Sequence, residues 1–278
     1  MAHAGANLAQ NKLFKVNQLQ QKRKGWKTGA VLLILIWILL FAFSMYLLEF
    51  LLAIFTSNPQ GQSITSMDWA GYLVTPDLEK PHEQVSGINA SWTVPRIGVL
   101  SSDTYSSAWI GIGGHSEKTL IQVGTEHDSV NGQEYYSAWY EMLPDDAIRI
   151  TSMSVSPGDS ITASITLVDS DTNEWAIRIH DVTKNKGFYR TFIYNSSRLS
   201  AEWIVERPYV NDEITMLANF GTMTFQDSYA KVGDNIGKIV SFPYSQVIMT
   251  NELGLQLAGV SPLGADGASF DVTYMSSG

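Results

Sequence analysis

The chain has 278 residues, a formal net charge of −9 and no cysteine. An acidic chain binds polyphosphates poorly, so we expect no nucleic-acid partner. The absence of cysteine excludes disulfides, thiolate metal sites and a cysteine nucleophile. With 45% hydrophobic residues, most of the chain has enough apolar surface to fold rather than to stay disordered.

The N-terminal part of the chain differs in charge from the rest. The first 60 residues hold six basic residues and one acid, whereas the remainder has a net charge of −14. An uncharged run from Gly29 to Leu48 is, as a helix, about as long as the roughly 30 Å hydrocarbon core of a bilayer. It is also longer than the apolar region of a cleaved signal peptide. The sequence therefore predicts a transmembrane helix over residues 29–55 that contacts the lipid bilayer.

The basic residues before this run set the expected topology, because basic flanks stay in the cytoplasm. We expect residues 1–28 to be a basic cytoplasmic tail and the C-terminal part to be extracellular, which makes a single-pass protein of the cell membrane. Residues 56–66 are polar and contain Pro and Gly, so they are interpreted as a short stalk.

From residue 67 onward, short β-branched and aromatic runs alternate with turn-forming clusters. Apolar and polar residues alternate with period two over 160–169, 174–182 and 268–274, which is typical of half-buried strands. We see no convincing amphipathic helix after Phe55. Residues 67–278 are therefore predicted to form one all-β domain, an antiparallel two-sheet β-sandwich, with a barrel as the alternative.

Few catalytic chemistries fit this composition. There is no G-x-S-x-G elbow and no H-E-x-x-H motif, so neither an α/β-hydrolase serine nor a zincin site is expected. The histidines of the β-rich part are scattered and are interpreted as exposed loop residues; they are His82, His115, His127 and His180. We expect neither a metal nor a cofactor, which leaves carboxylates as candidate catalysts.

Three segments place polar residues inside apolar strands. Gln122 lies within the run 120–124, and Glu141 follows a run of aromatic residues. In the third segment, residues 201–206, Glu202 and Glu206 share one strand face. Taken alone, each segment is more often a solvated strand face than a site.

Together, these segments resemble the glutamic peptidases, also called the eqolisin or G1 family. The motifs that carry the resemblance are Trp69-Ala70-Gly71, Ser91 to Pro95, Ser107 to Gly114, Gln122 in L-Q-x-G, Ala138 to Glu141, Gly158 to Ile161, Ala201 to Glu206, and Phe220 to Phe225. They extend over about residues 67–275, and their order and spacing make chance a poor explanation.

The resemblance implies a lectin- or glucanase-like sandwich and an acid endopeptidase with polypeptide substrates. It implies that Glu206 is the general base that activates water and that Gln122 stabilises the oxyanion. A carboxylate base, unlike a histidine, would remain ionised at low pH. The supporting residues of the cleft would be Trp69, Trp109, Glu126, Trp139 and Glu141.

Four positions depart from the family pattern: Gly113 and Ser137 replace aspartates, Leu143 replaces an aromatic residue, and Arg207 replaces the aspartate after Glu206. These departures leave fewer acidic residues around the base. We therefore expect them to affect the pH optimum and the substrate specificity more than the reaction itself.

Three alternatives stay open. The first is a catalytically inactive relative of the family. The second is a lectin-like sandwich whose tryptophans stack on glycans, namely Trp92, Trp109, Trp139 and Trp203. The third is a glycosidase that uses Glu141 and Glu206 as its carboxyl pair.

Overall fold

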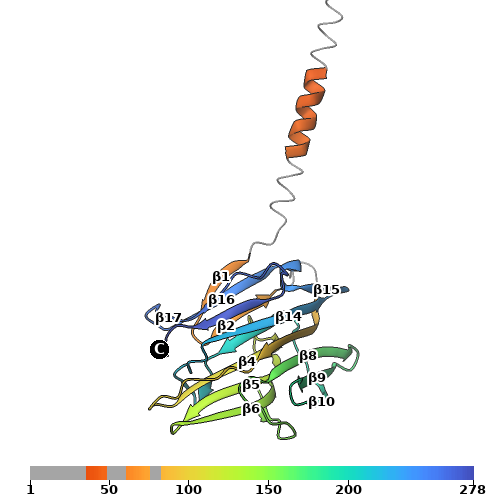
Figure 1. Ribbon diagram of the computed structural model, residues 1–278. Coiled ribbons are helices and arrows are strands. Elements are labelled where there is room, and N and C mark those ends of the chain that lie inside the picture. Colours follow the sequence, from red (N-terminus) through yellow and green to blue (C-terminus); the bar gives the residue numbers. More distant parts are fainter. Residues whose placement is uncertain (1–35, 49–60, 76–82) are drawn as a thin grey trace, which may run out of the picture. The chain divides into compact units, whose positions relative to one another are not determined.

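The computed structural model describes residues 36–48, 61–75 and 83–278. The chain divides into two compact units, Met1–Asn58 and Pro59–Gly278. In the first unit, residues 36–48 form an α-helix. The second unit contains all the strands of the described part of the chain (Figure 1).

The expected single-pass membrane anchor is a prediction that the structure contradicts. Among the described residues, no helix is both long enough and apolar enough to cross a membrane. The predicted location in the cell membrane is therefore wrong. The rest of the expected span 29–55, like the expected tail 1–28, lies outside the described residues.

The second unit is built almost entirely from strands. In chain order its elements are β1 Gln62–Ser66, β2 Trp69–Val74, β3 Val85–Thr93, β4 Thr104–Gly113, β5 Leu120–Val130, β6 Gln133–Met142, β7 Ile148–Arg149, β8 Ser160–Asp169, β9 Glu174–Asp181, β10 Lys186–Ile193, β11 Ala201–Glu206, β12 Tyr209–Val210, β13 Glu213–Ile214, β14 Thr222–Val232, β15 Asn235–Lys238, the 3-10 helix η1 Ile239–Ser241, β16 Tyr244–Thr250, β17 Gln256–Val260 and β18 Phe270–Tyr274. The three strands predicted from period-two alternation appear as β8, β9 and β18.

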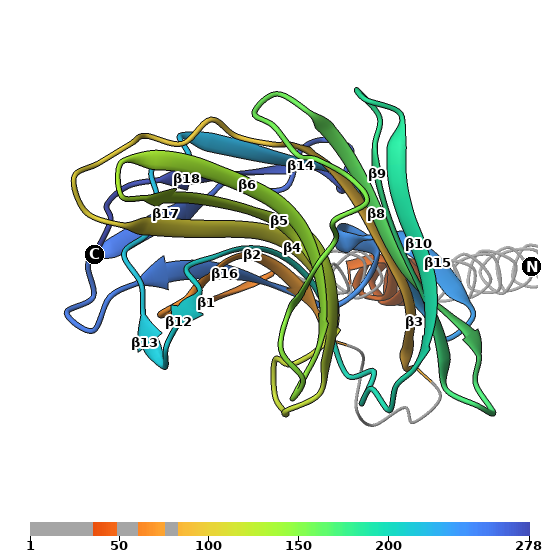
Figure 2. The same ribbon diagram turned by 90° about the horizontal axis from the view of Figure 1, so that it is seen from below.

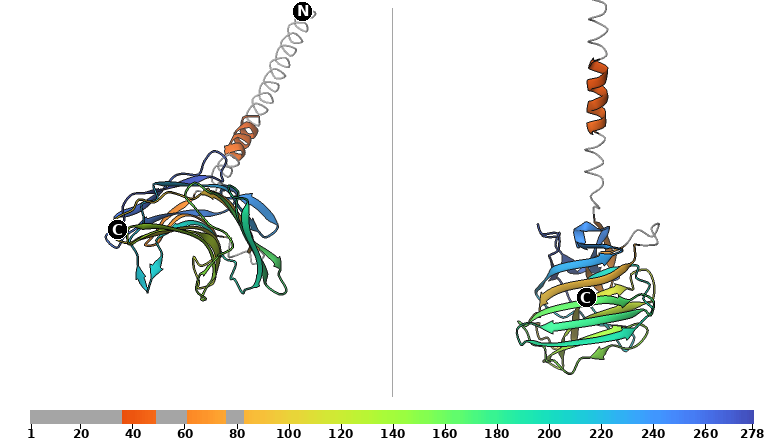
Figure 3. Two further views of the ribbon diagram at one scale, coloured as in Figure 1. Left: turned by 60° about the horizontal axis from the view of Figure 1, so that its bottom comes forward. Right: turned by 90° about the vertical axis from the view of Figure 1, so that its right-hand side faces the viewer.

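The prediction of an all-β antiparallel fold is confirmed, but the prediction of two sheets holds only in part. Neighbouring strands are hydrogen-bonded along one continuous path, in the order β10-β9-β8-β3-β14-β18-β17-β16-β2-β11-β4-β5-β6-β7. This large sheet is strongly bent, so that β3, β8 and β14 form one layer and β11, β4 and β5 form another (Figures 2 and 3). The short hairpin β12–β13 is the separate two-stranded sheet.

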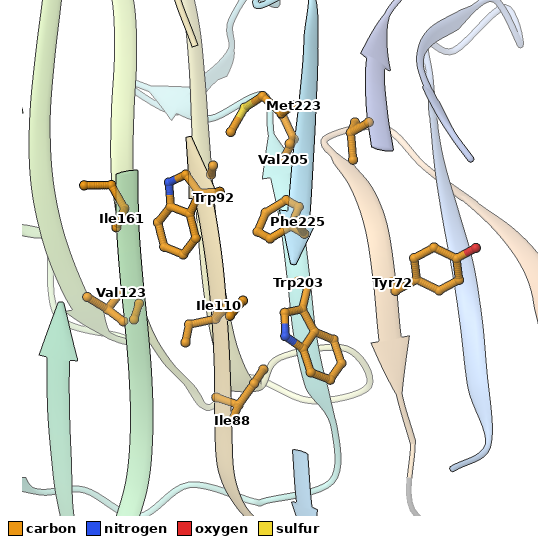
Figure 4. Packing of buried hydrophobic residues seen from close by; sticks show 14 of the residues in the cluster. Tyr72, Ile88, Trp92, Ile110, Val123, Ile161, Trp203, Val205, Met223 and Phe225 are labelled. Carbon is orange, nitrogen blue, oxygen red and sulfur yellow. The ribbon is translucent and has the colours of Figure 1, made fainter. Parts of the chain in front are cut away.

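The hydrophobic core lies between these two layers. Trp92 of β3 and Phe225 of β14 belong to the same buried cluster as Ile110 of β4 and Trp203 of β11 (Figure 4). Two indoles also bridge the layers by hydrogen bonds: Trp92 Nε1 donates to Thr125 Oγ1 at 3.0 Å, and Trp203 Nε1 donates to the Asn89 carbonyl at 3.0 Å. The polar atoms of these two buried indoles are thus satisfied, as their burial requires.

Residues 62–66, which were expected to belong to a stalk, form strand β1 instead. This strand pairs in parallel with β16, from Gln62 opposite Ser245 to Ser66 opposite Met249. It is the one parallel pairing among the described strands, and it places Ser66 next to the start of β2.

Candidate active site

Alternation along β11, β4, β5 and β6 sorts their side chains onto two faces. Directly paired residues of adjacent strands share a face. Ala108 and Ile110 of β4 point into the core, while Ser107 and Trp109 point to the opposite face. The same face carries Glu206 of β11, as the sequence predicts for this strand, because Glu206 is paired with Ser107.

Two rows of polar residues cross this face of the sheet. The first runs from Glu206 through Ser107 and Glu126 to Ser137, and the second pairs Gln122 with Glu141. Glu206 and Gln122 are far apart in the sequence but lie on β11 and β5, with only β4 between them. The topology therefore places both candidate catalytic residues on one face.

A cleft of about 410 Å³ lies over these rows. The residues that line it are Ser107, Gln122, Glu126, Trp139, Glu141, Ala147, Arg149, Glu206, Pro208, Tyr209 and Val210. The last three belong to the segment that leads from β11 into the hairpin β12–β13 (Figure 2). The cleft thus brings Gln122 and Glu206 together with Glu126, Trp139 and Glu141, but neither Trp69 nor Trp109 lines it.

Glu206 is held at the end of β11 by two indoles. Trp69 Nε1 donates to its Oε1 at 3.3 Å, and Trp109 Nε1 donates to its Oε2 at 2.7 Å. Ser107 Oγ lies 3.5 Å from the same Oε2. The two indole rings meet edge to face, with centroids 5.0 Å apart. Trp69 and Trp109 therefore position the carboxylate instead of lining the cleft.

The pKa of Glu206 is raised to about 7. Burial is the largest cause, because a buried carboxylate loses hydration, and the nearby charge of Asp68 adds to it. Hydrogen bonds from Trp109 and Trp69 favour the ionised form and act in the opposite direction. Glu202, on the same face of β11, is fully buried, and its burial raises its pKa well above the ordinary value.

Gln122 is oriented by its neighbour on β6. Its Nε2 donates a hydrogen bond to Glu141 Oε2, while its Oε1 has no hydrogen-bond partner among the described residues. Burial raises the pKa of Glu141, and the hydrogen bond from Gln122 opposes that rise. An amide NH₂ carries two hydrogens, so one remains free to donate into the cleft.

Glu126 and Asp128 form a second acidic pair at the end of β5. Ser137 Oγ donates to Glu126 Oε2 at 3.0 Å, so the serine that departs from the family pattern contacts the acid that lines the cleft. Burial, and next the charge of Glu126, raise the pKa of Asp128 to about 9. Asp128 is not among the residues predicted from the sequence, although it has the same strand parity as Gln122 and Glu126.

The other departures have local explanations. Gly113 has a φ of +92°, and a Cβ there would lie 2.3 Å from the Thr119 carbonyl oxygen, so an aspartate does not fit this backbone. Leu143 packs against the apolar cluster that contains Trp109. Arg207 is buried, and its Nη2 donates to the Met67 carbonyl at 2.8 Å.

The histidines and tryptophans correct two further expectations. His127 lies within β5 and is fully buried against Thr125, and burial lowers its pKa to about 3. His180 likewise lies in a strand, β9; His115 is exposed, and His82 lies outside the described residues. The four tryptophans considered as glycan platforms are all buried; they are Trp92, Trp109, Trp139 and Trp203. Their burial removes the basis of the lectin alternative. Within the described residues, no group of three or more His, Asp or Glu side chains is placed to hold a metal ion.

Comparison with known proteins identifies a family and relatives of this chain. The model of the Peptidase A4 family matches residues 67–267. Aspergillopepsin-2 of Aspergillus niger is 28% identical over 210 residues, which cover 74% of this chain and 72% of that protein. Scytalidopepsin B of Scytalidium lignicola is 32% identical over 124 residues, which cover 43% of this chain and 45% of that protein.

A solved structure of scytalido-glutamic peptidase with a transition state analog inhibitor has the same fold. Its TM-score is 0.63 at 21% identity, and the match covers 76% of this chain and 99% of that one.

Proposed function

Because the chain belongs to the Peptidase A4 family and is a glutamic endopeptidase, we propose that Glu206 and Gln122 are its catalytic residues. The observation that carries the proposal is that both side chains line one cleft, each oriented by its own hydrogen-bond partner. The substrates are polypeptides, which bind along this cleft.

In the proposed reaction, Glu206 accepts a proton from a water molecule while the water oxygen forms a bond to the peptide carbonyl carbon. The free N–H of Gln122 donates to the oxyanion that develops on the carbonyl oxygen. The tetrahedral intermediate then collapses, the C–N bond breaks, and Glu206 returns its proton to the leaving amine. Glu141 acts through Gln122, since it fixes the orientation of the amide.

The raised pKa of Glu206 sets the pH range of the free enzyme. A general base works in its ionised form, and the ionised fraction of Glu206 falls about tenfold per pH unit below its pKa of about 7. The resemblance to the family implies acid activity. A raised pKa of this base instead predicts that the activity of the free enzyme decreases as the pH falls below neutral.

The proposal is tested by digestion of a denatured protein between about pH 2 and pH 8 with the parent enzyme and three variants. We expect Glu206→Gln to lower kcat by about 10²–10⁴-fold and Gln122→Ala by about 10²–10³-fold. Glu252→Gln, at an exposed residue, is the matched control and should leave kcat unchanged.

Undiminished proteolysis by the Glu206 and Gln122 variants would refute the catalytic pair. A parent enzyme without proteolysis at any pH would instead indicate an inactive member of the family.

A further inference from the structure

Arg149 is a cation at the edge of the active-site cleft. It lies on β7, the last strand of the long sheet path, directly opposite Trp139 of β6. Paired residues share a face, so Arg149 points to the same side as Trp139, and both line the cleft with Gln122 and Glu206.

The charge of Arg149 is unusual for its surroundings. The other ionisable lining residues that carry charge are acids, namely Glu126, Glu141 and Glu206. Arg149 is exposed, and its side chain has no hydrogen-bond or ion-pair partner in the part of the chain that the structure describes. A guanidinium is a planar fork of donors that matches a carboxylate, so a free one in a substrate cleft fits an anionic group of the substrate.

We propose that Arg149 binds a carboxylate of the polypeptide substrate close to the scissile bond. The enzyme would then prefer substrates that carry a carboxylate at that position. The inference rests on the function proposed for Gln122 and Glu206. Two strand spacings, about 10 Å, separate the backbones of β5 and β7, and an extended peptide rises about 3.3 Å per residue. The bound carboxylate therefore belongs to a residue within about three positions of the cleaved bond.

This role has a defined dependence on pH. The substrate carboxylate, with an ordinary pKa near 4, must be ionised to pair with Arg149. Glu126, Glu141 and Glu206 face the same cleft and repel a carboxylate when they are ionised, so Arg149 supplies the attraction that admits it. The preference is present above about pH 4 and disappears as the substrate is protonated below it.

The test uses fluorogenic peptides that carry Glu or Gln at each of three positions on either side of the cleaved bond. A second pair, with a free or an amidated C-terminus, distinguishes a side-chain carboxylate from a terminal one. At about pH 6 we expect one position at which the carboxylate raises kcat/KM about tenfold, and we expect no preference at about pH 3. Arg149→Gln should remove the preference, so that the variant cleaves the Glu and Gln peptides with equal kcat/KM. Arg178→Gln, on strand β9 and not in the lining of the cleft, is the control and should retain the preference.

Direct binding separates this inference from the catalytic proposal. Kd is measured for the Glu and Gln peptides with the Glu206→Gln variant and with the double variant that also carries Arg149→Gln. A Kd ratio of about ten that Arg149→Gln abolishes supports the inference even if the catalytic proposal fails. Equal Kd values for the two peptides, or a ratio that survives Arg149→Gln, would overturn it.

Discussion

Individual neighbours of Glu206 shift the pKa of its carboxyl group in opposite directions. The charge of Asp68 raises its pKa, while the hydrogen bond from Trp69 lowers it. We therefore expect Asp68→Asn to move the acidic limb of kcat/KM to lower pH and Trp69→Phe to move it to higher pH. The pH dependence of kcat/KM reports pKa values of the free enzyme, so this profile is the appropriate measurement. If the acidic limbs of both variants coincide with that of the parent enzyme, a group other than Glu206 controls the pH profile of kcat/KM.

The same carboxylate affects stability. A carboxyl whose pKa is higher in the folded protein stabilises the fold only while it is protonated, so the parent loses stability as pH rises from about 4.5 to about 7. Glutamine is a neutral isostere without this loss. We expect the free energy of unfolding of Glu206→Gln to match the parent near pH 4 and to exceed it by on the order of 3 kcal/mol above pH 7. Urea titrations at both pH values measure the difference; a difference independent of pH would contradict the raised pKa.

At the level of strands, period-two alternation predicts much of what the structure contains. It predicts the bounds of β8 and β9 closely, and it places Glu202 and Glu206 on one face of β11. It cannot reveal that β4 lies between β11 and β5, because that pairing joins segments far apart in the sequence. The prediction that Gln122 and Glu206 act together therefore rests on the family resemblance. Alternation also cannot distinguish the buried Glu202 from the cleft residue Glu206, since burial depends on which segments of the chain pack over the face.

Gly124 shows how one position in β5 controls the site. It is paired with Trp109 of β4 on one side and with Trp139 of β6 on the other. A Cβ at Gly124 would lie 2.4 Å from the Ala108 carbonyl oxygen and 2.6 Å from Trp109 Cβ, so the backbone or Trp109 would have to move.

We expect Gly124→Ala to lower the free energy of unfolding by about 1–3 kcal/mol and to reduce kcat, because Trp109 holds Glu206. Gly87→Ala in β3 is the control, since its Cβ would meet no atom closer than 3.4 Å. Thermal unfolding and a kinetic assay measure both effects. Equal stability and activity of the Gly124 and Gly87 variants would show that the β4–β5–β6 segment adjusts without disturbing Trp109.

At the level of the whole molecule, one bent sheet forms both the core and the cleft. The inner faces of β4, β5 and β11 pack against β3 and β14, and the opposite faces of the same strands carry the catalytic candidates. The geometry of the site is therefore coupled to core packing. We propose that the catalytic domain extends beyond the expected range 67–278 to include β1, since β1 is part of the same sheet.

A comparison of residues 61–278 with residues 67–278 tests this domain boundary. The shorter fragment lacks β1, so β16 loses its parallel partner, and it also lacks Ser66. Ser66 Oγ donates to Asp68 Oδ1 at 2.5 Å and accepts from the Trp69 amide at 3.2 Å, so its loss frees two residues that act on Glu206. We expect the shorter fragment to lose roughly 5 °C or more in Tm.

Activity of the shorter fragment should fall as well, because Trp69 is less firmly held against Glu206. Ser66→Ala in the longer fragment separates the two causes: it removes the hydroxyl and keeps the β1–β16 pairing. If that variant loses activity but keeps its Tm, β1 contributes stability through the sheet and catalysis through Ser66. Equal Tm and equal activity of the two fragments would place the domain boundary after β1, where the sequence alone had put it.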